Sequence, residues 1–260
     1  MSWTTLLVER QGGIARVRLN RPDKRNAQSV ELWDELRRVG LEFEADPDIR
    51  VVVVSGEGHS FSAGIDLSVI LGQAQGHGSL APEVELVQQA FTWLRDARFA
   101  TIAMVQGYAL GAGFQLALAC DLRIFASDAV VALPEVNFGI LPDLGGAAWL
   151  PELVGPAKAK ELAFTGDRVP ADEALRLRIA NQVVARDQLE AVTMELAGRI
   201  AAKAPLAIAA IKRAVRAAEE SADHAIRVSA REVKVLLASA DFREAGQAMV
   251  EKRPPRFSGK

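Results

Sequence analysis

The spacing of apolar residues changes several times along the first hundred residues, and each spacing predicts a different element. Residues 4–10 and 14–20 are β-branched and partly alternating, with QGG between them, which predicts a hairpin of two strands. From Ser29 to about Ala45 apolar residues recur every three or four positions, which predicts an amphipathic helix with Ser29 as N-cap. The unbroken apolar run of RVVVVSG (50–56) predicts a buried strand.

Loops and a second set of elements follow this strand. Residues 57–67 (EGHSFSAGIDL) form a glycine- and serine-rich loop, and residues 69–82 (VILGQAQGHGSLAP) are polar enough to predict a mobile loop. We then expect a helix from about Pro82 to Arg98, a strand over residues 101–107, a helix that starts near Gly111 and a strand over residues 121–127. Strands that alternate with helices in this way indicate the α/β class.

The pattern changes again at about Gly146, because almost every later segment has helical spacing. Residues 206–221 contain a stripe of small residues with larger aliphatic residues beside it. Such a helix is suited to close packing, either within the chain or against another subunit. The stripe consists of Ala207, Ala210, Ala214 and Ala217.

Composition and charge exclude several classes of function. The chain has 260 residues and a formal net charge of −2, and its charges are scattered, so we expect neither a nucleic-acid surface nor a basic membrane patch. The single cysteine, Cys120, lies in an apolar segment; no intramolecular disulfide can form, and we expect a buried thiol in a reducing compartment. His59, His77 and His224 lack the spacing of metal ligands, so we predict no metal site. With no basic leader and no long apolar run, the sequence predicts a cytoplasmic protein.

Two glycine-containing turns, SAGID (62–66) and GAGF (111–114), each follow a predicted strand. The free N–H groups at the start of the helix near Gly111 favour an anion, and a second donor from residues 63–66 would complete a two-amide cradle for one oxygen. Gln115 lies three residues after Ala112 and would border this cradle. The residues alone leave simpler interpretations open: the glycines serve chain packing, and Gln115 caps its own helix.

Two carboxylates, Glu135 and Asp143, lie in the apolar segment LPEVNFGILPDLGG (133–146). Burial among Val131, Leu133, Val136 and Phe138 would raise a carboxyl pKa toward the range useful for proton transfer. The alternative is that both are surface loop acids. The basic turn RPDKRNA (21–27) is either a phosphate-binding loop or a solvated one.

Six motifs, taken in order, resemble those of the crotonase family, also called the enoyl-CoA hydratase/isomerase superfamily. They are NRPDKRNA, FSAGIDL, GYALGAGFQLALACDLRI, LPEVNFGILPDLGG, LAFTGDRVPADEA and EKRPPRF, and the similarity runs from about Leu7 to Phe257. The resemblance implies a spiral core of strand-strand-helix units over residues 1–200, with the acyl-CoA site. It also implies a helical region over residues 201–260 that supports a homotrimer or a dimer of trimers.

The resemblance also implies roles for particular residues. The backbone amides of Ile65 and Ala112 would form an oxyanion hole for a thioester enolate, and Glu135 would transfer protons. The coenzyme A carrier of the substrate is the only cofactor implied. Its contacts would come from Lys24, Arg25, Ala27, Ala63, Gly64, Ile65, Asp66 and Gly111.

The position of Gln115 distinguishes three hypotheses about the reaction. Hydratases of the family have a second glutamate there, whereas an amide cannot take up a proton at neutral pH. Asp143 matches a catalytic aspartate of the dienoyl-CoA isomerases. We therefore favour an enzyme that shifts an enoyl-CoA double bond with Glu135, Asp143 and Gln115 as catalytic residues. The alternatives are a hydratase that uses Glu135 and Gln115, and a non-catalytic acyl-CoA-binding protein.

Overall fold

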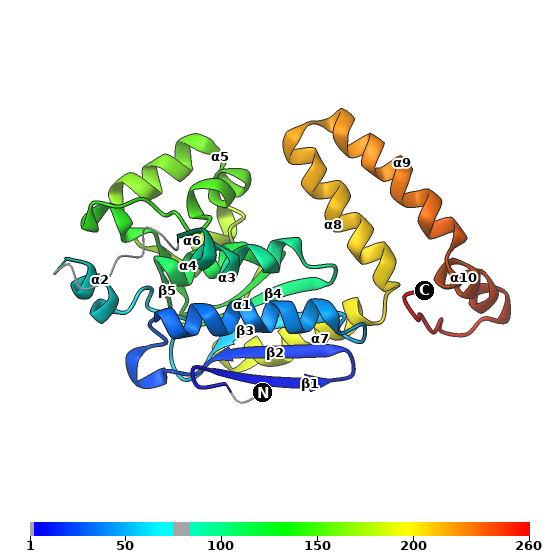
Figure 1. Cartoon of the computed structure of the whole chain (residues 1–260), viewed down its shortest axis with the longest axis horizontal. Helices are drawn as coiled ribbons and strands as arrows, with labels where there is room; N and C mark the ends of the chain where they lie inside the picture. The colour runs from blue at the N-terminus through cyan, green and yellow to red at the C-terminus, as the bar shows by residue number, and fades with distance from the viewer. Residues whose placement is uncertain (1–2, 75–83) are drawn as a thin grey trace.

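A six-stranded sheet forms the centre of the computed structural model, which describes residues 3–74 and 84–260 (Figure 1). The strand order is β1-β2-β3-β4-β6-β9, with β1 and β2 antiparallel and the remaining neighbours parallel. These strands are β1 (Leu6–Gln11), β2 (Ile14–Leu19), β3 (Val51–Gly56), β4 (Ala100–Val105), β6 (Leu122–Ala126) and β9 (Gln182–Val184). A smaller sheet, in the order β5-β7-β8, consists of β5 (Tyr108–Leu110), β7 (Val130–Ala132) and β8 (Val169–Pro170).

Helices cover both faces of the large sheet, which explains why β3 is apolar throughout. Val52 and Val54 pack into the core shared with α1, α3 and α4, whereas Val51 and Val53 pack with residues of α7. A strand buried on both faces reads as a continuous apolar run instead of an alternating one. The helices are α1 (Val30–Ala45), α2 (Leu67–Ala74), α3 (Val84–Asp96), α4 (Ala112–Ala119), α5 (Gly146–Thr165), α6 (Ala171–Arg176), α7 (Leu189–Ala201), α8 (Pro205–Glu220), α9 (Ala222–Ala238) and α10 (Ala240–Glu251).

Most of the long elements confirm the predictions from the sequence. The hairpin, the helix capped by the Ser29 hydroxyl, and the strands at 51–56, 100–105 and 122–126 are all present. The loop predicted over residues 69–82 was wrong at its start, because residues 67–74 form α2; residues 75–83 lie outside the described part of the chain. The short strands β8 and β9 interrupt the C-terminal half, which we predicted to be almost entirely helical.

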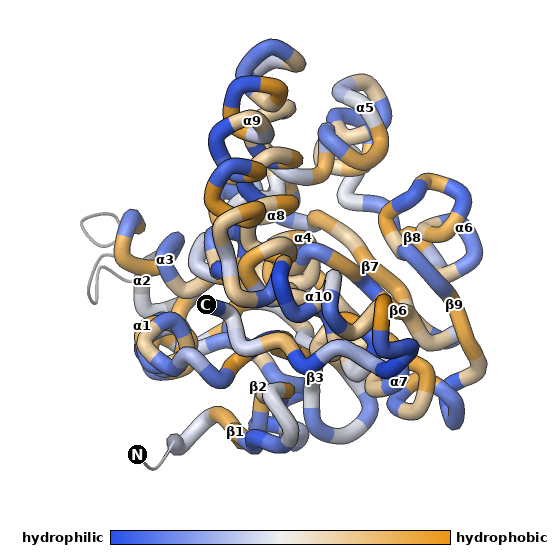
Figure 2. The backbone as a smooth tube through the Cα atoms, turned by 90° about the vertical axis from the view of Figure 1, so that its right-hand side faces the viewer, coloured by the Kyte–Doolittle hydropathy of each residue, from blue (hydrophilic) through white to orange (hydrophobic). Residues whose placement is uncertain are grey.

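The last three helices form an arm, α8 to α10, that extends from the sheet (Figure 1). Polar and apolar residues alternate along α9, as Figure 2 shows. No helix in the described residues is both long and apolar enough to span a bilayer.

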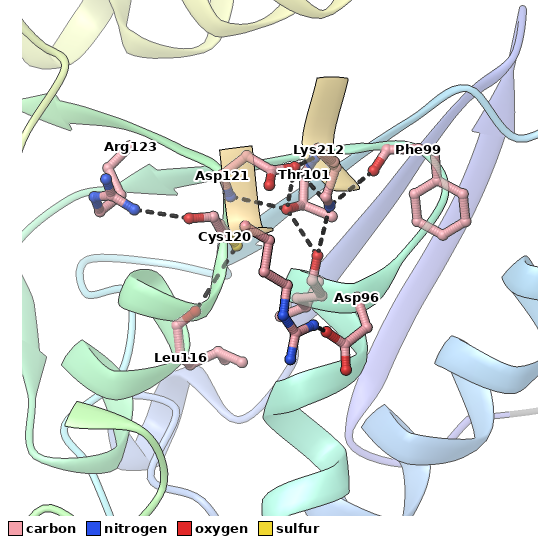
Figure 3. A network of polar contacts seen from close by, with 10 residues as sticks. Asp96, Phe99, Thr101, Leu116, Cys120, Asp121, Arg123 and Lys212 are labelled. Carbon is pink, nitrogen blue, oxygen red and sulfur yellow. Dashed lines mark hydrogen bonds and ion pairs between the residues drawn. The ribbon is translucent and has the colours of Figure 1, made fainter. Parts of the chain in front are cut away.

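Lys212 of α8 attaches the arm to the core (Figure 3). Its ammonium group donates to Leu94 O at 3.0 Å and to Phe99 O at 3.1 Å, at the end of α3, and lies 2.8 Å from an oxygen of Asp121. The same oxygen, Oδ2, also accepts hydrogen bonds from the backbone N–H and the hydroxyl of Thr101. Beside this network Cys120 is buried, as predicted, and burial raises the pKa of its thiol to about 12.

Candidate active site

A cavity of about 560 Å³ lies where four loops meet, each following a strand: β2, β3, β5 and β7. The loops are joined by backbone hydrogen bonds, among them Gln28 N–H to Gly64 O at 2.7 Å and Gly111 N–H to Ala132 O at 2.9 Å. The cavity is therefore held by main-chain contacts and not by side chains alone. Its walls comprise Lys24, Ala27, Ala63, Gly64, Ile65, Asp66, Leu67, Leu110, Gly111, Ala112, Pro134, Glu135, Asn137, Phe138 and Ile140.

The two glycine turns that carry Ile65 and Ala112 approach each other closely. Gly64 has φ +97°, and a Cβ added there would lie 2.7 Å from Leu110 O and 3.8 Å from Ala112 N. The close approach of the two turns thus requires glycine at this position. Within the described residues, neither Ile65 N–H nor Ala112 N–H donates a hydrogen bond. Ala112 begins α4, so its N–H has no partner in the helix and carries the positive end of the helix dipole.

Glu135 lies beside this pair of amides, on a short 3₁₀ helix (Pro134–Phe138) that follows β7. A Cβ added at Gly111, the N-cap of α4, would lie 3.3 Å from Glu135 Oε1, so the carboxylate lies at the N-terminus of this helix. The residue is only 5% exposed, so it is not a surface loop acid. Burial raises the pKa of Glu135, and the charge of Asp143 raises it further, against the opposing hydrogen bond from Gln115.

Gln115 contacts Glu135 and is fixed in one orientation. Gly146 N–H donates to Gln115 Oε1 at 2.9 Å, and Gln115 Nε2 donates to Glu135 Oε1 at 2.7 Å. The other carboxylate oxygen, Glu135 Oε2, is buried and has no hydrogen-bond partner among the described residues. The amide caps no N–H of its own helix. Gln115 is not among the residues that line the cavity, but it contacts Glu135, which does. That Gln115 borders the cradle stays a prediction.

Asp143 also lies outside the set of cavity-lining residues, although its charge acts on Glu135. It is half-buried, burial raises its pKa, and its carbonyl accepts a hydrogen bond of 2.8 Å from the Gln88 side chain of α3. Among the described lining residues the carboxylates are Glu135 and Asp66. Asp66 is engaged by Arg21 at 2.8 Å and by Lys24 at 3.6 Å. Hydrogen bonds from Ser68, together with Arg21, hold the pKa of Asp66 well below its usual range, so it stays ionised.

The predicted coenzyme A loop divides between two cavities. Lys24 and Ala27 line the cavity that contains Glu135, as do Ala63, Gly64, Ile65, Asp66 and Gly111. Arg25 does not: its guanidinium lies over the ring of Tyr108, 5.8 Å from the centroid, and lines a neighbouring cavity. The backbone of Arg25 still contacts a residue of the Glu135 cavity, because its carbonyl accepts a hydrogen bond from the N–H of Ala63, which lines that cavity.

Sequence reasoning missed three features of the site. Gly146 supplies the N–H that orients Gln115, and the only signal was the glycine pair at 145–146. Arg21 is the partner of Asp66. Phe138, expected to bury a carboxylate, is 54% exposed and lies with Ile140 in the cavity wall. In the described residues we find no group of three or more His, Cys, Asp or Glu side chains that could hold a metal ion.

Comparison with known proteins connects this geometry to a family. The sequence profile of the enoyl-CoA hydratase/isomerase family matches residues 9–260. A carnitinyl-CoA dehydratase of Citrobacter koseri is 40% identical, over 96% of this chain and 97% of that protein. The structure of an enoyl-CoA hydratase from Bacillus anthracis superposes with a TM-score of 0.93 and 30% identity, covering 99% of this chain and 100% of that one.

A Thermobifida fusca protein solved in complex with acetoacetyl-CoA has a TM-score of 0.83 and 36% identity, covering 90% of this chain and 95% of that one. These likenesses extend over nearly the whole chain and confirm the predicted crotonase-type fold with its helical C-terminal region. The chain belongs to the enoyl-CoA hydratase/isomerase family.

Proposed function

We propose that this protein is an acyl-CoA enzyme that shifts a carbon–carbon double bond between the 3-enoyl and 2-enoyl positions of a thioester. One observation carries the proposal: Glu135 is the only carboxylate of the described cavity wall that is not held in an ion pair. Gln115 donates a hydrogen bond to Glu135 Oε1, and the second carboxylate oxygen, Oε2, has no partner among the described residues. A double-bond shift needs one group that takes and returns a proton, and no added water.

The reaction follows from the arrangement of donors around the cavity. The thioester oxygen accepts hydrogen bonds from Ile65 N–H and Ala112 N–H, which stabilise negative charge that develops on it. Glu135 Oε2 removes a proton from C2 of the 3-enoyl-CoA, and the electron pair delocalises over the dienolate. Return of the proton to C4 gives the 2-enoyl-CoA and restores the carboxylate.

The raised pKa of Glu135 suits this role. A carboxylate with an ordinary pKa holds an abstracted proton too weakly at neutral pH, whereas burial shifts the group toward the pH at which the enzyme works. Gln115 opposes that shift, because its N–H stabilises the ionised form. We therefore assign Gln115 to positioning and tuning Glu135, and Asp143 to a contribution through its charge.

The second candidate is the reversible removal of water from a 3-hydroxyacyl-CoA. The names of the relatives favour it, since the Citrobacter koseri protein is a carnitinyl-CoA dehydratase. The same cradle would stabilise the same type of enolate. In this reaction Glu135 would both remove the C2 proton and protonate the departing oxygen, because the Gln115 amide donates hydrogen bonds without releasing a proton.

A direct assay separates these reactions. The purified protein is incubated with 3-enoyl-CoA and, separately, with 2-enoyl-CoA of short, medium and long acyl chains, and the products are analysed by mass spectrometry. Isomerisation leaves the mass unchanged, while hydration adds one water. Hydration of 2-enoyl-CoA at an enzymatic rate with no conversion of 3-enoyl-CoA would exclude the isomerase. A protein that binds acyl-CoA and converts neither substrate would be the non-catalytic alternative.

A further inference from the structure

A buried glutamine, Gln28, lies next to the cradle and takes no part in the proposed reaction. It follows the loop after β2, is 0% exposed, and is not among the residues that line the Glu135 cavity. An amide is costly to bury unless it is hydrogen-bonded, so a fully buried glutamine is expected where its hydrogen bonds fix a structure. The structure that these bonds fix is the turn that carries Ile65.

The backbone of Gln28 holds the peptide unit that contains the Ile65 N–H. Gln28 N–H donates to Gly64 O at 2.7 Å, and Asp66 N–H donates to Gln28 O at 2.9 Å. Every peptide bond of the described chain is trans, and in a trans unit the C=O and the N–H point in opposite directions. The hydrogen bond to Gly64 O therefore directs the N–H of Ile65 away from Gln28.

The side chain of Gln28 is held by hydrogen bonds at both of its polar atoms. Trp33 Nε1 donates to Gln28 Oε1 at 2.8 Å, and Gln28 Nε2 donates to Ser62 Oγ at 3.3 Å. Ser62 Oγ also accepts from Gly64 N–H at 3.3 Å and donates to Asn26 O at 2.8 Å. A serine hydroxyl offers one donor and two acceptor sites, so these three contacts use it completely.

Ser62 connects this network to the turn that carries the second donor, Ala112. Ser62 N–H donates to Tyr108 O at 2.9 Å and Leu110 N–H donates to Ser62 O at 3.0 Å, so residue 62 is bound to β5, the strand that leads into α4. A Cβ added at Gly113, the residue after Ala112, would lie 2.4 Å from Ser62 O. Ser62 therefore packs against the first turn of α4 and links the two turns.

We propose that Gln28 and Ser62 are positioning residues, whose side-chain hydrogen bonds hold the two amide donors of the cradle at the separation that a thioester oxygen requires. The need for them lies in Gly64, which has φ +97° and no side chain to restrict its backbone. Its N–H is bonded to the Ser62 hydroxyl and its C=O to the Gln28 backbone, so both of its peptide groups are fixed from outside. This role rests on the cradle of the proposed function and is the same for either candidate reaction.

The carbonyl stretch of a bound thioester measures the strength of the cradle. A saturated acyl-CoA labelled with ¹³C at the thioester carbonyl does not react, and its free and bound forms are compared by infrared difference spectroscopy. Hydrogen bonds polarise the C=O bond, so we expect a shift to lower frequency in the unmodified protein and a smaller shift in Gln28→Leu and in Ser62→Ala. Ser62→Ala removes a single oxygen atom and keeps the test open if Gln28→Leu does not fold.

Two infrared results would contradict the proposal in different ways. No shift in the unmodified protein would remove the cradle itself, and the role of both residues with it. A normal shift in the unmodified protein that either variant keeps in full would leave the cradle in place and overturn the positioning role alone.

Kinetics and a matched control separate positioning from stability. Removal of an oxyanion donor costs about 10²–10³-fold in kcat, and displacement of a donor that remains present costs less, so each variant is expected to lose roughly tenfold in kcat with KM within about twofold. Thr193→Val in α7, on the opposite face of the sheet from α4, removes a fully buried hydroxyl that donates to Leu189 O at 2.7 Å. It should leave the infrared shift and kcat unchanged. Equal losses in Thr193→Val and Gln28→Leu would refute the positioning role, because loss of any buried hydrogen bond would then be sufficient.

The double variant tests whether the two residues act together. Because Gln28 Nε2 and Ser62 Oγ share a hydrogen bond, the losses in kcat should not multiply, and Gln28→Leu with Ser62→Ala should lose about as much as the more damaging single change. Losses that multiply would show two independent effects and exclude a shared network.

Discussion

Replacement of Glu135 by glutamine tests the proposed chemistry with little change of shape. In the unmodified protein Gln115 Nε2 donates to Glu135 Oε1 at 2.7 Å. The variant keeps the length of the side chain and an amide oxygen that can accept this hydrogen bond. It removes the group that accepts the proton. A positioned acid–base group contributes about 10²–10⁴-fold to rate, which corresponds to roughly 3–5 kcal/mol of activation free energy. We expect turnover of 3-enoyl-CoA to fall by that factor.

The pH dependence gives the same test a second readout. Glu135 must be ionised to accept the C2 proton, so kcat/KM should fall as the pH drops through its pKa. Because burial and the charge of Asp143 raise this pKa, the fall should occur above the ordinary carboxyl range. The residual activity of Glu135→Gln should lack this dependence.

Stability provides the control. A carboxyl group whose pKa is raised in the folded state contributes most to stability below its unfolded pKa, and the contribution is lost as the pH rises through the folded pKa. Glu135→Gln should therefore be at least as stable as the unmodified protein at neutral pH, and the difference should shrink in acid. Thermal unfolding between pH 4 and 8 measures this difference in stability. If the variant is as stable as expected, unfolding does not account for its loss of activity.

Initial rates with 3-enoyl-CoA, together with calorimetric binding of a saturated acyl-CoA, complete the assay. Binding should change little, because the amides of Ile65 and Ala112 are untouched. Turnover above one-tenth of the original in Glu135→Gln would refute the assignment. So would a greater loss in Asp143→Asn than in Glu135→Gln, since Asp143 is expected to act through its charge alone.

Three further predictions concern the tuning residue, the cradle and the assembly. Gln115→Glu should create or raise hydration of 2-enoyl-CoA, measured by mass spectrometry, and unchanged hydration would count against the two-carboxylate argument. Gly64→Ala should destabilise the fold by about 1–3 kcal/mol in chemical denaturation, because φ is +97° and the new Cβ meets Leu110 O. Light scattering should show three or six chains, the number that the resemblance to crotonases implies, and an assembly could cover Met249 and Val250 of α10, which are 81% and 83% exposed. A stable monomer would contradict this.

Elements with strong periodicity were predictable from the sequence, while elements defined by distant partners were not. The apolar run of β3 and the spacing in α1 are local signals. In contrast, β8 and β9 contain two and three residues, and they exist because they pair with β7 and β6. The start of α2 did carry a local signal, since Asp66 accepts from Ser68 N–H, but the glycines and polar residues that follow favoured a loop.

In the site, too, local motifs were predictable and contacts between distant residues were not. The motifs predicted Glu135, Ile65 and Ala112 as site residues, and these residues line one cavity. No local pattern indicates that Gly146 fixes the amide of Gln115, because the two residues are 31 positions apart. Nor does the loop sequence show that the left-handed conformation of Arg25 accompanies a side chain directed to Tyr108.

The attachment of the arm through Lys212 has a consequence for the order in which the chain is made and folded. The lysine bonds to carbonyls of residues 118 and 113 positions earlier, Leu94 and Phe99. During synthesis the carbonyls of Leu94 and Phe99 leave the ribosome long before Lys212, which donates hydrogen bonds to them. Contacts of such large sequence separation form late, because the loop between them must close first. The sheet can thus assemble while these carbonyls are still bound to water, and docking of Lys212 then replaces that water as a late step in folding.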